Sequence, residues 1–211
     1  MQINAHSPAS YSTHSRLEKG RQHRNVNEQV RAEFQAIVSQ REQSKALNAK
    51  QFMATLTLNQ LETLRVYHGQ ASPIHVTQLT EEGAWNLVVH DDQFKDLDGD
   101  GNYSVGRGEL FLFPPPEAPS EVHEAYAQLS EDEQLAVYHA AAAKQHVHQL
   151  AQQDSRIAIQ GKSLLDLPDF SYGKLVDDLL DFLELQGRYE SSEEHIRSSE
   201  AVRAFKEALE K

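Results

Sequence analysis

The residues best suited to chemistry lie in one short acidic stretch, residues 96–109, which reads D-L-D-G-D-G-N-Y-S-V-G-R-G-E. Three aspartates alternate with small or apolar residues, glycines follow closely, and a glutamate ends the stretch. Alternating carboxylates on a tight loop supply the six to eight oxygen ligands that calcium takes at roughly 2.3–2.6 Å. The stretch therefore predicts a bound Ca²⁺ ion. We expect its ligands to come from Asp96, Asp98, Asp100, Asn102, Ser104 and Glu109.

This stretch resembles the calcium loop of the EF-hand family, in which a helix leads into a twelve-residue loop and a second helix leaves it. The resemblance covers only Thr80 to Phe113. The preceding G-A-W-N-L and the following F-P-P-P make it similar to bacterial proteins with a single such loop. The resemblance implies a helix-loop-helix that binds calcium, and it implies no catalytic activity.

The family's loop fits this stretch in two registers. In the first, Asp96 opens the loop and Gly101 takes the sixth position, where the backbone turns sharply and φ is positive. This register is the literal match. Its twelfth position falls on Arg107, which cannot bind a cation.

In the second register Asp98 opens the loop and Glu109 becomes the bidentate twelfth ligand. Tyr103 then takes the sixth position, where a left-handed backbone costs roughly 1–2 kcal/mol. Loss of a bidentate carboxylate costs more than one strained residue, so energy favours this register. A slightly enlarged loop that also uses Asp96 is a compromise between the two.

Two readings compete with a calcium site. One is a metal-free acidic turn, which the mutual repulsion of three close carboxylates disfavours. The other is magnesium, which prefers fewer protein ligands and more waters than this stretch offers. The eleven histidines suggest no further metal site. His146 and His148, for example, are two apart on a predicted helix and point in nearly opposite directions.

Composition excludes several classes of function. The 211 residues carry a net charge of −12, and only the first fifty, with eight basic and four acidic residues, are basic. The remainder of the chain, which is strongly acidic, should repel nucleic acid and anionic membranes. The absence of cysteine excludes disulfides, zinc–thiolate sites and cysteine nucleophiles. The chain carries no phosphate loop, nucleophile elbow or zinc-protease motif, so we expect no enzyme.

Neither an apolar signal segment nor an apolar run of about 18 residues occurs, which predicts a cytoplasmic protein. Export by a route that reads the polar N-terminus stays an alternative. Apolar residues at three- and four-residue steps predict helices over most of the chain. Capping signals mark helix ends at Asn25 or Asn27, Gly69, Thr80, and the Ser130–Glu133 pair.

The predicted fold is all-α: an irregular helical domain with one EF-hand-like helix-loop-helix and a C-terminal helical bundle. Residues 1–24 should form a disordered basic tail. Residues 25–118 should hold the calcium loop and a proline-rich connector, 114–119. Residues 119–211 should form a C-terminal helical region packed on the first.

These features predict a calcium-binding protein whose ion stabilises a helical protein-interaction scaffold. Pro114 cuts short the outgoing helix, so a fixed structural role is favoured over that of a sensor. A calcium sensor that dimerises or exposes a partner surface is one alternative. An exported or appendage-associated structural protein, addressed by residues 1–24, is another. The expected partner is an unidentified protein or a second copy of the chain, not nucleic acid or membrane.

Overall fold

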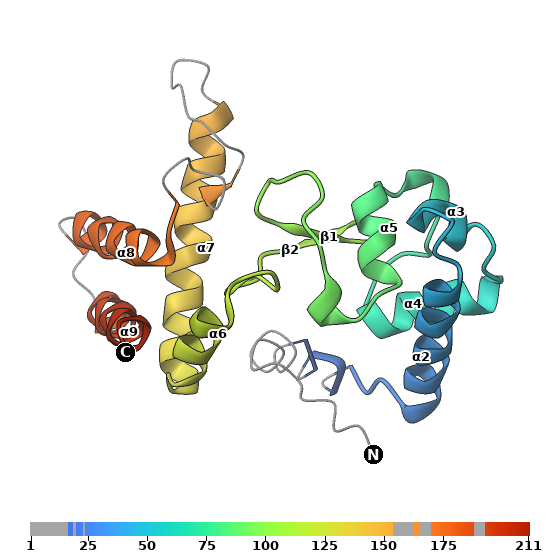
Figure 1. Cartoon of the computed structure of the whole chain (residues 1–211), viewed down its shortest axis with the longest axis horizontal. Coiled ribbons are helices and arrows are strands. Elements are labelled where there is room, and N and C mark those ends of the chain that lie inside the picture. Colours follow the sequence, from blue (N-terminus) through green and yellow to red (C-terminus); the bar gives the residue numbers. More distant parts are fainter. Residues whose placement is uncertain (1–16, 19, 23, 154–162, 165–169, 188–192) are drawn as a thin grey trace. The chain divides into compact units, whose positions relative to one another are not determined.

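The computed structural model of the protein describes residues 17–18, 20–22, 24–153, 163–164, 170–187 and 193–211. Helices dominate these residues, and the sheet found among them is a two-stranded antiparallel hairpin (Figure 1). The mostly helical prediction is therefore confirmed. No helix in the described part of the chain is both long and apolar enough to cross a membrane.

The chain divides into two compact units. The N-terminal unit contains the described residues up to 98 together with 102–112. The C-terminal unit contains residues 99–101 and the described residues from 113 onward. The division thus falls at residue 112–113, a few residues before the predicted boundary at 118–119, and the tip of the acidic stretch is grouped with the C-terminal unit.

The N-terminal unit is built from short helices around one apolar core. Helix α2 packs on α4, α3 on α5, and α5 on β1. The fully buried side chains of Phe34, Phe52 and Leu64 lie at the centre of the core. Its elements are α2 (Glu28–Gln43), α3 (Ala49–Met53), α4 (Leu58–His68), η1 (Val76–Gln78), α5 (Glu81–Leu87), η2 (Asp91–Gln93), β1 (Tyr103–Val105) and β2 (Gly108–Leu110).

Local capping chemistry sets the helix ends of this unit. Asn27 caps α2 and Thr80 caps α5, each by accepting a hydrogen bond from the backbone three residues on. Gly69 ends α4 in the left-handed conformation, with φ of 69°. Helix α4 is separate from α3 and begins at Leu58, because Thr57 caps it and forms a capping box with Gln60.

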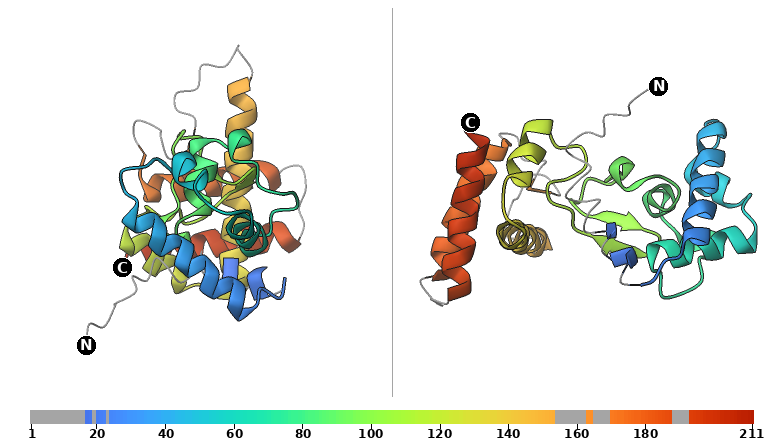
Figure 2. Two further views of the ribbon diagram at one scale, coloured as in Figure 1. Left: turned by 90° about the vertical axis from the view of Figure 1, so that its right-hand side faces the viewer. Right: turned by 90° about the horizontal axis from the view of Figure 1, so that it is seen from below.

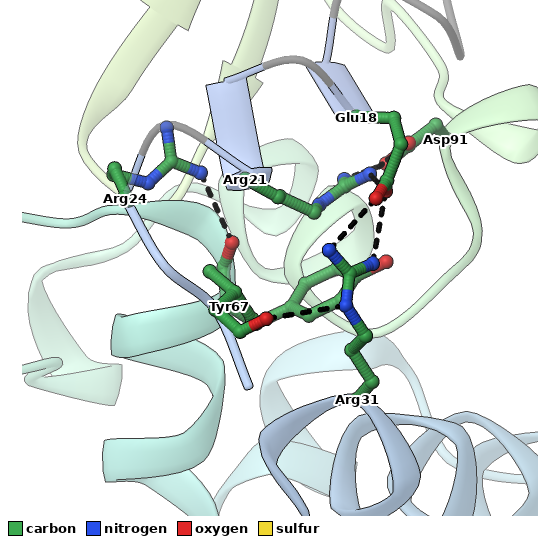
Figure 3. Close-up of polar contacts among 7 residues, drawn as sticks. Glu18, Arg21, Arg24, Arg31, Tyr67 and Asp91 are labelled. Atoms are coloured by element: carbon green, nitrogen blue, oxygen red, sulfur yellow. Dashed lines mark hydrogen bonds and ion pairs between the residues drawn. The ribbon is translucent and has the colours of Figure 1, made fainter. Parts of the chain in front are cut away.

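The segment before α2 packs against the core, which differs from the flexible tail expected there. Arg21 is only 2% exposed, and its guanidinium binds the buried carboxylate of Asp91 (Figure 3). Glu18 accepts from Arg31 on α2 and fixes the segment from a second side. These two long-range ion pairs hold the segment against the core although its sequence is polar. The rest of the predicted tail, residues 1–16, lies outside the described residues.

The acidic stretch leads into a hairpin, not a second helix. Strands β1 and β2 pair with Tyr103 opposite Leu110 and Ser104 opposite Glu109. Tyr103 and Val105 are buried while Ser104 between them is half-buried, the alternation typical of a strand. On the other side, α5 ends at Leu87, and the 3₁₀ turn η2 and an extended segment precede the loop. The predicted helix-loop-helix therefore differs from the structure at both flanks.

The C-terminal unit is a helical bundle, as predicted. Its elements are α6 (Ser120–Ala127), α7 (Glu131–Gln153), α8 (Tyr172–Gly187) and α9 (Glu193–Leu209), and α9 packs on the other three (Figure 2). Phe113, Tyr126 and Phe205 form a triangle of edge-to-face rings with centroids 5.8–5.9 Å apart. The Ser130–Glu133 capping box is present at the start of α7.

Candidate metal centre

Helix α5 presents two buried polar side chains to the acidic stretch. Glu82 and Asn86 are four residues apart, so they lie one above the other on the same face of the helix. Glu82 is 5% exposed and Asn86 is fully buried. Buried polar groups of this kind need hydrogen-bond partners, and both find them in the loop backbone.

The carboxylate of Glu82 accepts three backbone N–H groups from the loop. Oε2 lies 2.7 Å from the Leu97 nitrogen and 3.3 Å from the Asp98 nitrogen. Oε1 lies 2.6 Å from the nitrogen of Ser104 on β1. One side chain thus joins the beginning of the loop to the strand that leaves it.

The amide of Asn86 forms a second clamp one helical turn further on. Its oxygen accepts the N–H of Lys95 at 2.9 Å, and its Nδ2 donates to the Lys95 carbonyl at 2.9 Å. The same nitrogen donates to the Ser104 carbonyl at 2.8 Å. All the polar atoms of this buried amide are therefore satisfied by loop and strand backbone.

A close backbone approach brings α5 against the hairpin turn. The Gly106 N–H donates to the Gly83 carbonyl at 2.9 Å. A Cβ atom at Gly83 would lie 2.2 Å from the Gly106 carbonyl oxygen, so only glycine fits there. This contact explains why α5 carries a glycine in its interior in spite of the cost in helix propensity.

Glu82, Asp96 and Asp98 bring three carboxylates together. Each offers an oxygen atom, and these atoms all lie within 4.8 Å of one another. All three residues belong to the N-terminal unit. Glu82 is buried, Asp96 is half-buried and Asp98 is exposed, so the cluster is buried at Glu82 and accessible to solvent at Asp98. Donor oxygens at about 2.3–2.6 Å from a shared cation would be separated by distances in this range.

The electrostatics of the cluster favour a cation. Burial raises the pKa of Glu82, and the charge of Asp96 raises it further. The backbone hydrogen bonds from Ser104, Leu97 and Asp98 act in the opposite direction but do not cancel the rise. A divalent cation between the carboxylates would reverse both unfavourable effects, because it compensates the mutual repulsion and replaces the lost solvation.

The other predicted ligands lie outside this cluster. Glu109 is exposed on β2, opposite Ser104. The Asp100 carbonyl accepts from Gln145 at 2.7 Å and from Gln149 at 3.2 Å, both on α7. Ser104, predicted to offer its carbonyl, has that oxygen hydrogen-bonded to Asn86. Asn102 is half-buried just before β1.

The backbone of the loop matches the first register at the sixth position. Gly101 has φ of 82°, the left-handed conformation that this position requires. A Cβ there would also lie 2.5 Å from side-chain atoms of Gln145 and Ser163. Tyr103, the sixth residue of the second register, is buried in extended strand β1 instead. Arg107, which cannot bind a cation, is exposed at the hairpin turn.

Sequence reasoning missed Glu82, and the structure shows what it contributes. Its carboxylate stands beside Asp96 and Asp98, where the literal register lacks a twelfth-position acid. The signal was present as a pair of polar residues, Glu82 and Asn86, at a four-residue spacing on an otherwise apolar helix face. Such a pair on a short, capped helix indicates buried polar side chains that need hydrogen-bond partners, but it does not identify those partners.

Comparison with protein-family models, with curated proteins and with solved structures gave no match.

Proposed function

We propose that the protein binds one calcium ion through Glu82, Asp96 and Asp98, and that the ion stabilises a helical protein-interaction scaffold. The observation that carries the proposal is the cluster of three carboxylates whose oxygen atoms lie within 4.8 Å of one another. Hard oxygen donors of this kind suit calcium, which tolerates irregular coordination and leaves positions for backbone oxygens and water.

The ion's role follows from what the cluster connects. Glu82 already joins α5 to the loop and to β1 through backbone hydrogen bonds. A cation shared with Asp96 and Asp98 would add a second set of links between the same elements. It would also remove the repulsion between three close carboxylates, so the loop and hairpin should be better ordered with the ion than without it.

A structural role is favoured over a sensor's role because the loop continues into a hairpin. A sensor EF-hand opens by changing the angle between two long helices. Here the 3₁₀ turn η2 and the hairpin β1–β2 flank the loop. The partner we propose is another protein or a second copy of the chain, since the net charge of −12 opposes nucleic acid and anionic membranes.

Thermal unfolding of the full chain, in EDTA and in millimolar calcium, tests the proposal. Free ligand at 100 times its dissociation constant stabilises by about 2.7 kcal/mol, a shift of several degrees for a chain of this size. We expect the wild type to shift and Asp98→Asn not to shift. Magnesium at the same concentration should shift the wild type less than calcium does.

The matched control is Asp92→Asn, an exposed aspartate in η2 outside the cluster, which should shift as the wild type does. Equal melting of the wild type in EDTA and calcium would overturn the calcium proposal. Sedimentation velocity with and without calcium separates the structural role from the sensor alternative. A sensor should change its association state, whereas a structural site should leave it unchanged.

A further inference from the structure

A cavity of about 150 Å³ lies between the segment that precedes α2 and the core of the N-terminal unit. It is separate from the carboxylate cluster. Its lining combines two arginines and two further polar side chains with apolar side chains and two glycines. The polar side chains are those of Arg21, Arg24, His68 and Gln70.

The polar part of the cavity lining is positively charged, because it includes Arg21 and Arg24 and no acidic residue. Arg21 is neutralised by Asp91, but its Nε is buried and has no hydrogen-bond partner in the part of the chain that the structure describes. Arg24 donates to the Tyr67 carbonyl at 3.2 Å and forms no ion pair within the described residues (Figure 3). Burial and the neighbouring charge of Arg21 lower the pKa of Arg24. Arg24 is exposed, so its guanidinium is solvated and stays available to an anion that enters the cavity from solution.

Arg24 is held at the cavity by packing as well as by its hydrogen bond. It lies against the backbone of Gly69, where a Cβ atom would come within 2.7 Å of the Arg24 Nε. Nearby, Gln70 donates to the Val105 carbonyl at 2.9 Å, so its amide is fixed in the cavity wall. These contacts preorganise the polar part of the lining before any ligand arrives, which lowers the entropic cost of binding.

His68 adds a neutral ring to the lining. Its Nε2 lies 3.1 Å from the Leu87 carbonyl, and because a carbonyl only accepts, Nε2 carries the proton. The other ring nitrogen, Nδ1, is then a lone-pair acceptor, which cannot hydrogen-bond to a carboxylate, so His68 contributes no polar contact to such a ligand. Burial lowers the pKa of His68 to about 4, so the ring stays neutral near neutral pH and Arg24 supplies the charge.

The apolar part of the lining sets the kind of ligand. Leu17, Phe94 and Leu110 contribute to it, and a cavity of about 150 Å³ is the size that holds a benzene ring. We propose that this cavity binds a small monocarboxylate with an apolar body, about the size of benzoate. The carboxylate would pair with Arg24 and accept from the free Nε of Arg21, while the apolar body would lie between Phe94 and Leu110.

Titration of the ¹⁵N-labelled full chain with sodium benzoate, followed by NMR in EDTA, tests the proposal. EDTA removes the metal centre from the result, so failure here and failure of the calcium proposal are distinguishable. We expect saturable shifts at residues lining the cavity. Benzamide, which has the same shape without the charge, should bind at least about ten-fold more weakly, because hydrogen bonds to charged groups are the stronger ones.

Two variants and one matched control sharpen the experiment. Arg24→Gln should weaken benzoate binding about ten-fold or more. Gly108→Val should block the cavity without strain, because a Cβ there meets the Val105 oxygen at 3.7 Å and the Gln70 nitrogen at 3.9 Å, both ordinary contacts. Arg203→Gln, which removes an exposed arginine from α9, should bind as the wild type does.

Three results would overturn the proposal. The first is the absence of saturable shifts in the wild type at tens of millimolar benzoate. The second is equal binding of benzoate and benzamide, which would leave only an apolar cavity. The third is unchanged binding in Gly108→Val, which acts on the cavity without altering any charge. Because the chain's net charge of −12 disfavours anions in general, specific benzoate binding would identify a local site.

Discussion

The guanidinium of Arg21 and the carboxylate of Asp91 form a buried, two-pronged ion pair between residues seventy positions apart, with N–O distances of 2.7 and 2.5 Å. Both side chains are almost fully buried. Arg21 also lies over the Tyr67 ring, 4.2 Å from its centroid. This pair attaches the segment before α2 to the turn η2, and it places Arg21 and Arg24 at the wall of the cavity.

We expect Asp91→Ala to lower the free energy of unfolding by about 3–5 kcal/mol, because it leaves the charge of Arg21 buried without a partner. Replacing both members, as Arg21→Met with Asp91→Leu, should cost much less than either single change. Urea unfolding of the three variants provides the measurement. Asp92→Ala, next in sequence but exposed, should change stability by less than about 0.5 kcal/mol. A small effect of Asp91→Ala would mean that the segment is not docked in solution.

Calcium affinity should depend on Glu82 and not on Glu109. Glu82→Gln removes a charge from the cluster and should weaken calcium binding at least about ten-fold, as ligand charge sets affinity in such sites. Glu109→Gln changes an exposed residue of β2 and should bind as the wild type does. Isothermal titration calorimetry distinguishes the two. Loss of binding in Glu109→Gln alone would instead support the register that opens at Asp98.

Asn86→Leu should destabilise the N-terminal unit by about 2–3 kcal/mol. The change leaves the Lys95 N–H and the Ser104 carbonyl without their buried partner, and each unsatisfied group costs about 1–3 kcal/mol. Thermal unfolding measures this loss. Asn59→Leu, an exposed position in the first turn of α4, serves as the control for the same exchange. Equal stability of wild type and Asn86→Leu would contradict the clamp that we describe.

Stability should fall in mildly acidic solution because of His68. Its pKa is about 4 in the folded protein and near 6.5 when unfolded, so the unfolded chain binds the proton first as pH falls. The stabilisation is complete above pH 6.5 and is lost progressively between about pH 6.5 and 4, up to a magnitude on the order of 3 kcal/mol.

Unfolding curves for the wild type and His68→Gln across that pH range test this expectation. The variant should lose most of the pH dependence, because glutamine cannot take up the proton. His139→Gln, on an exposed face of α7, should keep the wild-type profile. Parallel profiles for wild type and His68→Gln would show that another group controls acid stability.

Phe205→Ala should cost about 3–5 kcal/mol in the C-terminal unit. The ring is fully buried and completes the edge-to-face triangle with Phe113 and Tyr126. Removing it leaves a cavity that its neighbours fill only in part. Far-ultraviolet circular dichroism during urea unfolding follows the change. Retention of wild-type stability would indicate that the triangle rearranges around the smaller residue.

Much of the local structure could be predicted from the sequence because local contacts decide it. Asn27, Thr80 and Ser130 cap helices by bonding to residues three positions away, and Gly69 ends α4 through its own backbone freedom. The acidic stretch could also be recognised from the sequence, because alternating aspartates and glycines are typical of a cation-binding loop. The hairpin was not predicted, because the family resemblance assigned Tyr103 and Val105 to the loop and implied a helix after it, whereas these two side chains alternate with Ser104 as in a strand.

The sequence by itself determined most of the helices, several of their caps and the two aspartates, Asp96 and Asp98, that begin the candidate site. Only the tertiary structure decided that Glu82 is the third carboxylate and that Arg21 belongs to the core. The physical reason is the range of the interactions. A cap forms within one helical turn, whereas Glu82 meets the loop fourteen residues away and Arg21 meets Asp91 seventy residues away. Such partners are chosen by packing of the whole unit, which no local pattern records.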